Sequence, residues 1–265
     1  MKIIGEKING TIKSVGTAIV ERDRAFIQLL AQQQAEEDAD WLDVNAGTSP
    51  ERELDDLLWL IECVQDVTDV PICIDSANPE PLTQAVKAVK ITPMINSISL
   101  ERKKIEEILP VVRDNNCEVI ALAMDDRGIP KDIESRLEII EKLLEITGAE
   151  GIPREKVFID PLVMAMATNT ESGNIALQTI SRTAEKFPDV HFAAGLSNIS
   201  FGLPNRSIIN KAFVTLAISA GLDTAIMNPL DRGVRASILA AELLLGRDRH
   251  CKRYSRASKN GLVGS

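Results

Sequence analysis

The chain has 265 residues, of which 45% are hydrophobic and 26% charged, and its formal net charge is −9. This composition is typical of a water-soluble globular protein, and the length suits one (β/α)8 barrel, an architecture of roughly 250 residues. The acidic balance argues against a nucleic-acid footprint, which needs clustered Lys and Arg, and no apolar run is long enough to span a membrane. The N-terminus shows no signal-peptide pattern and the four cysteines are widely scattered, so we expect a cytoplasmic protein without disulfides.

Eight short apolar segments rich in strand-forming residues recur along the chain, at residues 2–5, 41–45, 71–75, 93–97, 119–124, 157–161, 191–197 and 224–228. The segments between them show helical periodicity. Ser49–Pro50 and Asn78–Pro79 predict helix starts, each with a capping side chain before a proline suited to the first turn. Eight alternating units predict a parallel sheet closed into a single TIM barrel of class α/β over residues 1–265. The basic tail predicts a loosely attached C-terminal extension at residues 247–265.

Polar residues stand at or just beyond the C-terminal end of each predicted strand. In chain order they are Glu6 and Asn9, Asp43 and Asn45, Asp75 with Ser76 and Asn78, Asn96 with Ser97, Asp125, Asp160, Ser197 with Asn198, and Asn228. In a (β/α)8 barrel these ends converge on the rim that carries active sites. Any one of them could instead cap a turn or a helix, but that explanation is poor for all eight ends together. We therefore expect a functional site on this rim.

Amides and carboxylates dominate the predicted rim, and it contains no histidine. The chain has only His191 and His250, and neither stands at a rim position, so a Ser-His-Asp hydrolase and a histidine-based metal site are both disfavoured. The segment from Gly195 to Gly202 lacks the spacing of dinucleotide-binding or P-loop motifs. We predict no metal site, and instead an array of donors and acceptors suited to a flat, polar heterocycle.

A pterin ring fits such an array, because its 2-amino group and N3–H form two parallel donors that one carboxylate can accept together. Asp160, which precedes Pro161 at a strand end, is our candidate for that contact. Asn96 and Asp75 would meet the remaining ring nitrogens and the carbonyl. The apolar neighbours expected to supply a face for the ring are Met164, Met166 and Ile199.

Six short motifs occur in order along the chain, at residues 4–10 (IGEKING), 43–47 (DVNAG), 74–76 (IDS), 94–97 (MINS), 159–162 (IDPL) and 195–200 (GLSNIS). Together they resemble the methyltetrahydrofolate:corrinoid protein methyltransferases, relatives of dihydropteroate synthase and of the folate-binding domain of cobalamin-dependent methionine synthase. The resemblance covers nearly the whole chain. It implies a homodimer that moves a methyl group between N5 of tetrahydrofolate and the cobalt of a corrinoid carried by a partner protein.

The resemblance also implies roles for individual residues. Asp75, Asn96 and Asp160 would hold the pterin of tetrahydrofolate or 5-methyltetrahydrofolate, and Asn198 would hydrogen-bond near N5. Because a tertiary amine is a poor leaving group, N5 needs a proton or a strong hydrogen bond, which Asn198 linked to Asp75 or water would supply. Further contacts are expected from Glu6, Asn9, Asp43, Asn45, Ser197, Arg206 and Asn228. One departure is Phe201, which stands where relatives carry a polar Gln, so contacts beyond Asn198 are expected to differ.

The corrinoid itself is expected on the partner protein. Residues 189–194 approach the Asp-x-His-x-x-Gly motif of cobalamin-binding proteins, but Ala194 replaces the glycine. His191 also lies where the seventh strand begins, opposite the rim, so we interpret it as a structural residue.

Two alternative functions stay open. A dihydropteroate synthase-like enzyme must hold a leaving pyrophosphate with basic groups, including a Lys on the seventh strand, where Ser197 and Asn198 stand instead. Arg232 after the eighth strand is alone a weak signal for that chemistry. A non-catalytic folate-binding protein would use the same polar strand ends, and turnover with a methylated corrinoid would separate it from an enzyme.

Overall fold

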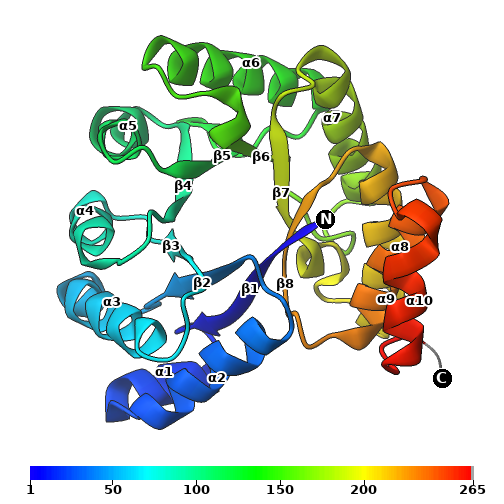
Figure 1. The fold of residues 1–265 in the computed structure, drawn as a ribbon. Coiled ribbons are helices and arrows are strands. Elements are labelled where there is room, and N and C mark those ends of the chain that lie inside the picture. Colours follow the sequence, from blue (N-terminus) through cyan, green and yellow to red (C-terminus); the bar gives the residue numbers. More distant parts are fainter. Residues whose placement is uncertain (264–265) are drawn as a thin grey trace.

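The computed structural model describes residues 1–263, and its strands form a closed barrel in the order β1-β2-β3-β4-β5-β6-β7-β8 (Figure 1). Every neighbouring pair is parallel, and β1 pairs with both β2 and β8, which closes the sheet. The predicted (β/α)8 barrel is therefore confirmed. The strands are β1 (Lys2–Asn9), β2 (Trp41–Asn45), β3 (Ile72–Asp75), β4 (Met94–Leu100), β5 (Glu118–Asp125), β6 (Val157–Asp160), β7 (His191–Gly195) and β8 (Thr224–Met227).

Helices surround the barrel and pack their apolar faces on the outside of the strands (Figure 1). Among residues 1–263, no helix combines the length and the apolar character needed to cross a membrane. The helices are α1 (Lys13–Glu21), α2 (Arg24–Glu36), α3 (Pro50–Gln65), α4 (Pro79–Ala88), the π-helix η1 (Lys104–Ile108), α5 (Leu109–Asp114), α6 (Ile133–Ala149), η2 (Arg154–Lys156), α7 (Ser172–Lys186), η3 (Leu196–Ser200), α8 (Arg206–Ala220), α9 (Arg232–Leu244), η4 (Arg249–Cys251) and α10 (Lys252–Lys259).

Helices α3 and α4 begin with a proline in the first turn, as predicted, but the predicted capping side chains are wrong. Neither the side chain of Ser49 nor that of Asn78 accepts a hydrogen bond from its helix. The amide of Asn78 donates instead to the carboxylate of Glu53 on α3, and the hydroxyl of Ser76 donates to the same carboxylate at 2.6 Å. These side chains therefore tie the loop after β3 to the neighbouring helix.

The barrel interior consists of an apolar layer with a polar layer above it. Side chains alternate between the two faces of a strand, so every second residue points inward. One set of inward residues forms a buried apolar cluster of Ile4, Trp41, Cys73, Met94, Ile120, Phe158 and Ala193. Two residues further along the same strands come Glu6, Asp43, Asp75, Asn96, Leu122, Asp160 and Gly195. The apolar layer therefore forms the floor beneath a mostly polar ring.

The opposite end of the barrel is closed by aromatic contacts. The ring of His191 stacks on Phe158 with centroids 4.8 Å apart, and its Nδ1 lies 2.5 Å from Oδ2 of Asp223. The ammonium group of Lys2 lies over the ring of Trp41, 4.9 Å from the centroid. His191 thus has packing and hydrogen-bond partners at the end where strands begin.

An irregularity in β1 changes which side chains reach the rim. The register with β2 shifts between Gly5 and Ile8. The N–H of Lys7 donates to Oε1 of Gln34 on α2 at 3.0 Å, and a Cβ on Gly5 would stand only 2.5 Å from that same oxygen. Gly5 therefore leaves the space for Gln34 to approach the strand and hold the irregular segment.

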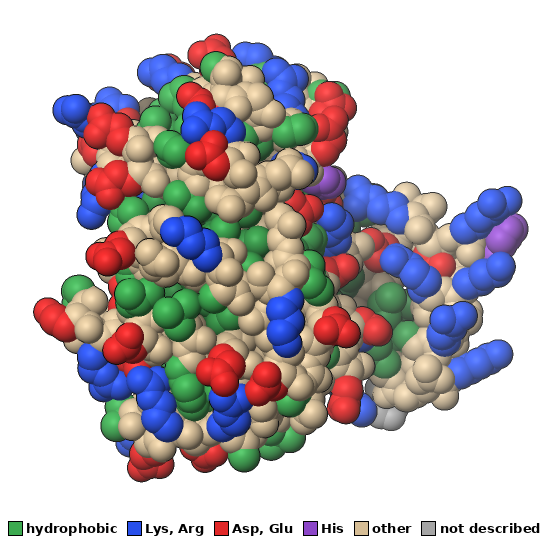
Figure 2. All heavy atoms as spheres, turned by 60° about the vertical axis from the view of Figure 1, so that its left-hand side comes forward, with side chains coloured by type: hydrophobic (Ala, Val, Ile, Leu, Met, Phe, Trp, Pro, Cys, Tyr) green, Lys and Arg blue, Asp and Glu red, His purple; other side chains and the backbone are tan. Residues whose placement is uncertain are grey.

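The C-terminal segment turns back against α9. The backbone N–H groups of Arg253 and Tyr254 donate to the carboxylate of Asp248, and the guanidinium of Arg253 pairs with Glu242 on α9. Figure 2 shows Lys and Arg side chains gathered on this projecting part, while the rest of that face mixes both signs. Of the extension predicted at residues 247–265, residues 264–265 lie outside the described residues.

Candidate active site

A cavity of about 830 Å³ opens at the C-terminal ends of the strands. Most of the polar residues expected to bind the pterin or to make further contacts line it: Glu6, Asn9, Asp43, Asp75, Asn96, Asp160, Ser197, Asn198, Arg206 and Asn228. Of the other polar residues predicted at the strand ends, Asn45, Ser76, Asn78, Ser97 and Asp125 are not part of the lining. Asn45 lies beside the lining residues, and its Nδ2 donates to Oδ2 of Asp75 at 2.7 Å. The fold therefore brings residues from seven of the eight strands, or from the loops after them, into one site.

Acidic groups crowd the polar ring that lines this cavity. Asp43 is only 3% exposed, and burial together with the charge of Asp75 raises its pKa well above the ordinary value, although Asn96 donates to it at 3.3 Å. Burial also raises the pKa of Asp75, against the hydrogen bond from Asn45. Burial raises the pKa of Glu6 to about 6, which the charge of Lys7 partly opposes. Poorly hydrated carboxyl groups of this kind favour a ligand that presents N–H donors.

Asp160 stands at the end of β6 and faces the cavity. Burial raises its pKa to about 6, while a hydrogen bond from the N–H of Leu162 and the charge of Arg136 both oppose the rise. The N–H of Leu162 lies 2.7 Å from Oδ1. One edge of the carboxylate is thus fixed by the backbone, which leaves the group able to accept donors from a ligand.

The turn that carries Asn198 is held in place by Arg206. Asn198 is exposed to the cavity in the middle of η3. Arg206, the first residue of α8, donates Nη2 to the carbonyl of Ser197 at 2.7 Å and Nε to the hydroxyl of Ser200 at 3.0 Å. Arg206 therefore fixes the chain on both sides of Asn198.

The predicted apolar face is wrong. The hydrophobic residues that line the cavity are Ile12, Phe201 and Ile226, and Met164, Met166 and Ile199 are not among its lining. The side chain of Ile199 is 2% exposed in the main core, and Met166 packs against that core. The short η3 turn points Ile199 inward, whereas Phe201 is 67% exposed at the mouth, with its ring centroid 5.8 Å from the guanidinium of Arg206.

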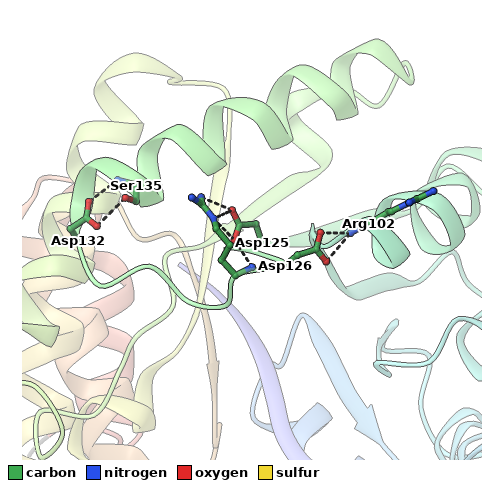
Figure 3. A network of polar contacts seen from close by, with 6 residues as sticks. Arg102, Asp125, Asp126, Asp132 and Ser135 are labelled. Atoms are coloured by element: carbon green, nitrogen blue, oxygen red, sulfur yellow. Dashed lines mark hydrogen bonds and ion pairs between the residues drawn. The ribbon is translucent and has the colours of Figure 1, made fainter.

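Asp125 is also misplaced by the prediction, because it does not line the cavity. Its carboxylate accepts hydrogen bonds from the N–H and guanidinium of Arg127, and these hydrogen bonds lower its pKa (Figure 3). The inward residue at the corresponding height of β5 is Leu122. The polar ring is thus interrupted at β5.

Several cavity residues were missed from the sequence: Lys7, Thr11, Ser207, Asn210 and Asp231. Lys7 directly follows an inward residue, so regular alternation would turn it outward, and the irregularity of β1 brings it to the cavity instead. Ser207 and Asn210 lie on the first turns of α8, where the strand-end pattern gives no signal.

Comparisons with known proteins bear on this site. A family model described as "Pterin binding enzyme" matches residues 8–228. The chain is similar to the methylcorrinoid:tetrahydrofolate methyltransferase of Eubacterium limosum, with 41% identity over 266 residues that cover 100% of this chain and 98% of that protein. It is 28% identical to the methionine synthase of Mycobacterium tuberculosis over 239 residues, which are 85% of this chain but only 20% of that protein.

Among solved structures, the dihydropteroate synthase of Stenotrophomonas maltophilia superposes with a TM-score of 0.70 at 22% identity, covering 94% of both chains. The dihydropteroate synthase of Xanthomonas albilineans gives 0.69 at 24% identity, covering 94% of this chain and 93% of that one. At this level of identity the likeness shows a shared fold.

Proposed function

Because the chain belongs to the pterin-binding enzyme family, we propose that it is a methyltransferase that moves a methyl group between N5 of tetrahydrofolate and a corrinoid carried by a partner protein. The observation that carries this proposal is the single cavity that collects Asp75, Asn96, Asp160 and Asn198 at the barrel rim. The 41% identical relative is named for transfer from a methylcorrinoid to tetrahydrofolate, which favours that direction here.

In this proposal the pterin lies in the polar ring. Asp160 accepts the 2-amino group and N3–H together, and Asn96 and Asp75 meet the other ring nitrogens and the carbonyl. A carboxylate accepts both donors only when it is ionised. Because the pKa of Asp160 is about 6, the group is mostly ionised at neutral pH and becomes protonated in mild acid.

Asn198 lies on the η3 turn near N5. The partner's corrinoid supplies the methyl group in one direction and accepts it in the other. As the N5 lone pair forms its bond to the methyl carbon, the methyl–cobalt bond of the corrinoid substrate would break and leave its electron pair on the cobalt, and the N5–H proton must leave. The side-chain amide of Asn198 orients this proton away from the methyl group. Asp75, whose pKa burial raises, then accepts the proton directly or through water. In reverse the same groups return the proton to N5, which makes it a better leaving group.

The wider assignments follow the same proposal. The chain forms a homodimer with one pterin-binding domain over residues 1–265 and a C-terminal extension at 247–265, and the corrinoid protein docks over the cavity mouth near Phe201. A cytoplasmic location is supported by the free, buried thiols of Cys63, Cys73 and Cys117.

The test follows the corrinoid absorbance in two mixtures of the purified protein. One contains tetrahydrofolate and methylcobalamin, and the other contains 5-methyltetrahydrofolate and reduced cobalamin. We expect methyl exchange in at least one mixture, abolished in Asp160→Ala and retained in Asp125→Asn. Folate binding without exchange, also in the presence of a purified corrinoid protein, would overturn the methyltransferase in favour of a folate-binding protein.

A further inference from the structure

Arg136 of α6 is a buried cation, only 3% exposed, that binds backbone oxygens alone. Its Nε donates to the carbonyl of Pro130 at 3.1 Å. Its Nη1 donates to the carbonyls of Pro161 and Leu162, the latter at 2.8 Å. Among residues 1–263, no carboxylate forms an ion pair with this guanidinium. Burying an unpaired charge is costly, so its position requires a reason beyond packing.

The backbone that Arg136 holds directly follows Asp160. Leu162 has φ +60°, a left-handed conformation that a bulky side chain disfavours, and its N–H donates to Oδ1 of Asp160 at 2.7 Å. The guanidinium thus binds the two carbonyls of the loop whose N–H orients the carboxylate. If these carbonyls were released, the loop could relax toward ordinary backbone angles and the carboxylate would lose its fixed edge.

The start of α6 is itself anchored, so Arg136 projects from a fixed position. Asp132 caps the helix by accepting the N–H of Ser135 at 2.8 Å, and Asp126 of the same loop accepts the N–H of Arg102 (Figure 3). Arg136 comes one turn after the cap. The loop after β5 and the loop after β6 are therefore joined through one side chain.

We propose that Arg136 is a positioning residue for pterin recognition, which holds the Pro161–Leu162 segment so that Asp160 stays aimed into the cavity and which places a positive charge near that carboxylate. This inference rests on the proposed function. It is supported by the direction in which Arg136 acts on Asp160, since its charge lowers the pKa that burial raises. The other charged groups that line the same cavity are Glu6, Lys7, Asp43, Asp75, Arg206 and Asp231.

The test compares two variants. Arg136→Met removes both the positive charge and the N–H donors, whereas Arg136→Lys keeps the charge but lacks the planar guanidinium group with its several N–H donors. The matched control is Arg182→Met, because Arg182 contacts the same helix through Glu134 but lies at the surface. The readouts are the titration of the Asp160 carboxyl carbon by NMR in the ligand-free protein and the Kd for tetrahydrofolate from pH 5 to pH 8, with thermal unfolding to confirm the fold.

We expect Arg136→Met to raise the measured pKa of Asp160 and to weaken tetrahydrofolate binding at pH 7 by about tenfold or more, with the acid limb of binding moved to higher pH. In Arg136→Lys, the loss of tetrahydrofolate binding at acid pH should occur near the same pH as in the wild type. Binding should nevertheless be weaker, because an ammonium group lacks the planar set of donors of a guanidinium group. The control should match the wild type in both readouts.

A folded Arg136→Met variant with wild-type titration and affinity would overturn the inference. If that variant does not fold, unchanged tetrahydrofolate affinity in Arg136→Lys would overturn it equally. If the wild-type protein binds no folate, the proposed function fails, whereas the titration of Asp160 still reports whether Arg136 acts on that carboxylate.

Discussion

The amide of Asn45 donates to the carboxylate of Asp75 across neighbouring strands, with Nδ2 and Oδ2 2.7 Å apart. Both residues end their strands, β2 and β3, but only Asp75 lines the cavity. Asn45 therefore acts on the site through Asp75, whose pKa its hydrogen bond lowers against the effect of burial.

Replacing Asn45 with Ala should weaken tetrahydrofolate binding at pH 7 by about fivefold to tenfold, because a charge-assisted hydrogen bond that orients the carboxylate is lost. Asp75→Ala should weaken it more. Isothermal titration would measure both, with Asn174→Ala on the exposed face of α7 as the control. Equal losses for Asn45→Ala and Asp75→Ala would mean that Asn45 contacts the ligand itself.

Asn198→Ala should slow methyl transfer by about 10²-fold or more while changing the tetrahydrofolate Kd by less than about tenfold, because the lost hydrogen bond strengthens as charge changes at N5. Single-turnover rates at saturating folate would separate the two quantities. Should rate and affinity fall by the same factor, Asn198 would be a binding residue only.

Asp160→Asn should stabilise the ligand-free protein at pH 8 although it abolishes function. Burial raises the pKa of Asp160 from 3.8 to about 6, so the folded state is favoured when the group is protonated and loses that advantage as pH rises through 6. The variant should melt higher than the wild type by about 2–4 °C or more at pH 8, which corresponds to roughly 1 kcal/mol, and the gain should vanish near pH 4. Scanning calorimetry across this range would measure the difference.

Asp125→Asn is the matched control for that experiment and should show the opposite sign. Hydrogen bonds from Arg127 lower the pKa of Asp125, so its ionised form favours the folded state above its unfolded pKa. The variant should melt no higher than the wild type at pH 8. A gain of stability in both variants would point to net charge and not to burial as the cause.

Phe201→Gln, which replaces the exposed ring with a polar side chain, should leave the tetrahydrofolate Kd within about threefold but lower the rate with a corrinoid protein by about tenfold. The ring is 67% exposed, whereas Asp43 among the polar groups of the cavity is only 3% exposed. Leu244→Gln, an exposed apolar residue at the end of α9, serves as the control. A loss confined to folate affinity would place Phe201 against the folate.

Along a β-strand, side chains point alternately to the two faces of the sheet, and this regular alternation explains why so much of the site could be predicted from the sequence. Because inward residues recur at every second position, Cys73 and Asp75, or Phe158 and Asp160, occupy successive layers of the same interior. The strand ends can be located from the apolar runs, and closure of the barrel then gathers their polar residues. The barrel itself follows from eight such units.

The errors come from places where local geometry departs from that alternation. Lys7 reaches the cavity through the irregular register of β1, and Asp125 lies past the last inward position of β5. The η3 turn buries Ile199 in the core, and Phe201 lines the cavity. Arg136 lies on a helix and acts through backbone carbonyls, so no spacing in the sequence connects it with Asp160.

The buried apolar layer formed by Phe158, Trp41 and their neighbours lies beneath the polar residues that line the cavity. If the corrinoid protein docks over the cavity mouth as proposed, it and the folate approach from the same end of the barrel, so the kinetics should be ordered. The folate has to enter before its macromolecular co-substrate covers the mouth, and the modified folate has to depart after it. Excess corrinoid protein should then inhibit turnover by binding the folate-free enzyme and blocking the cavity mouth. A higher folate concentration should relieve that inhibition.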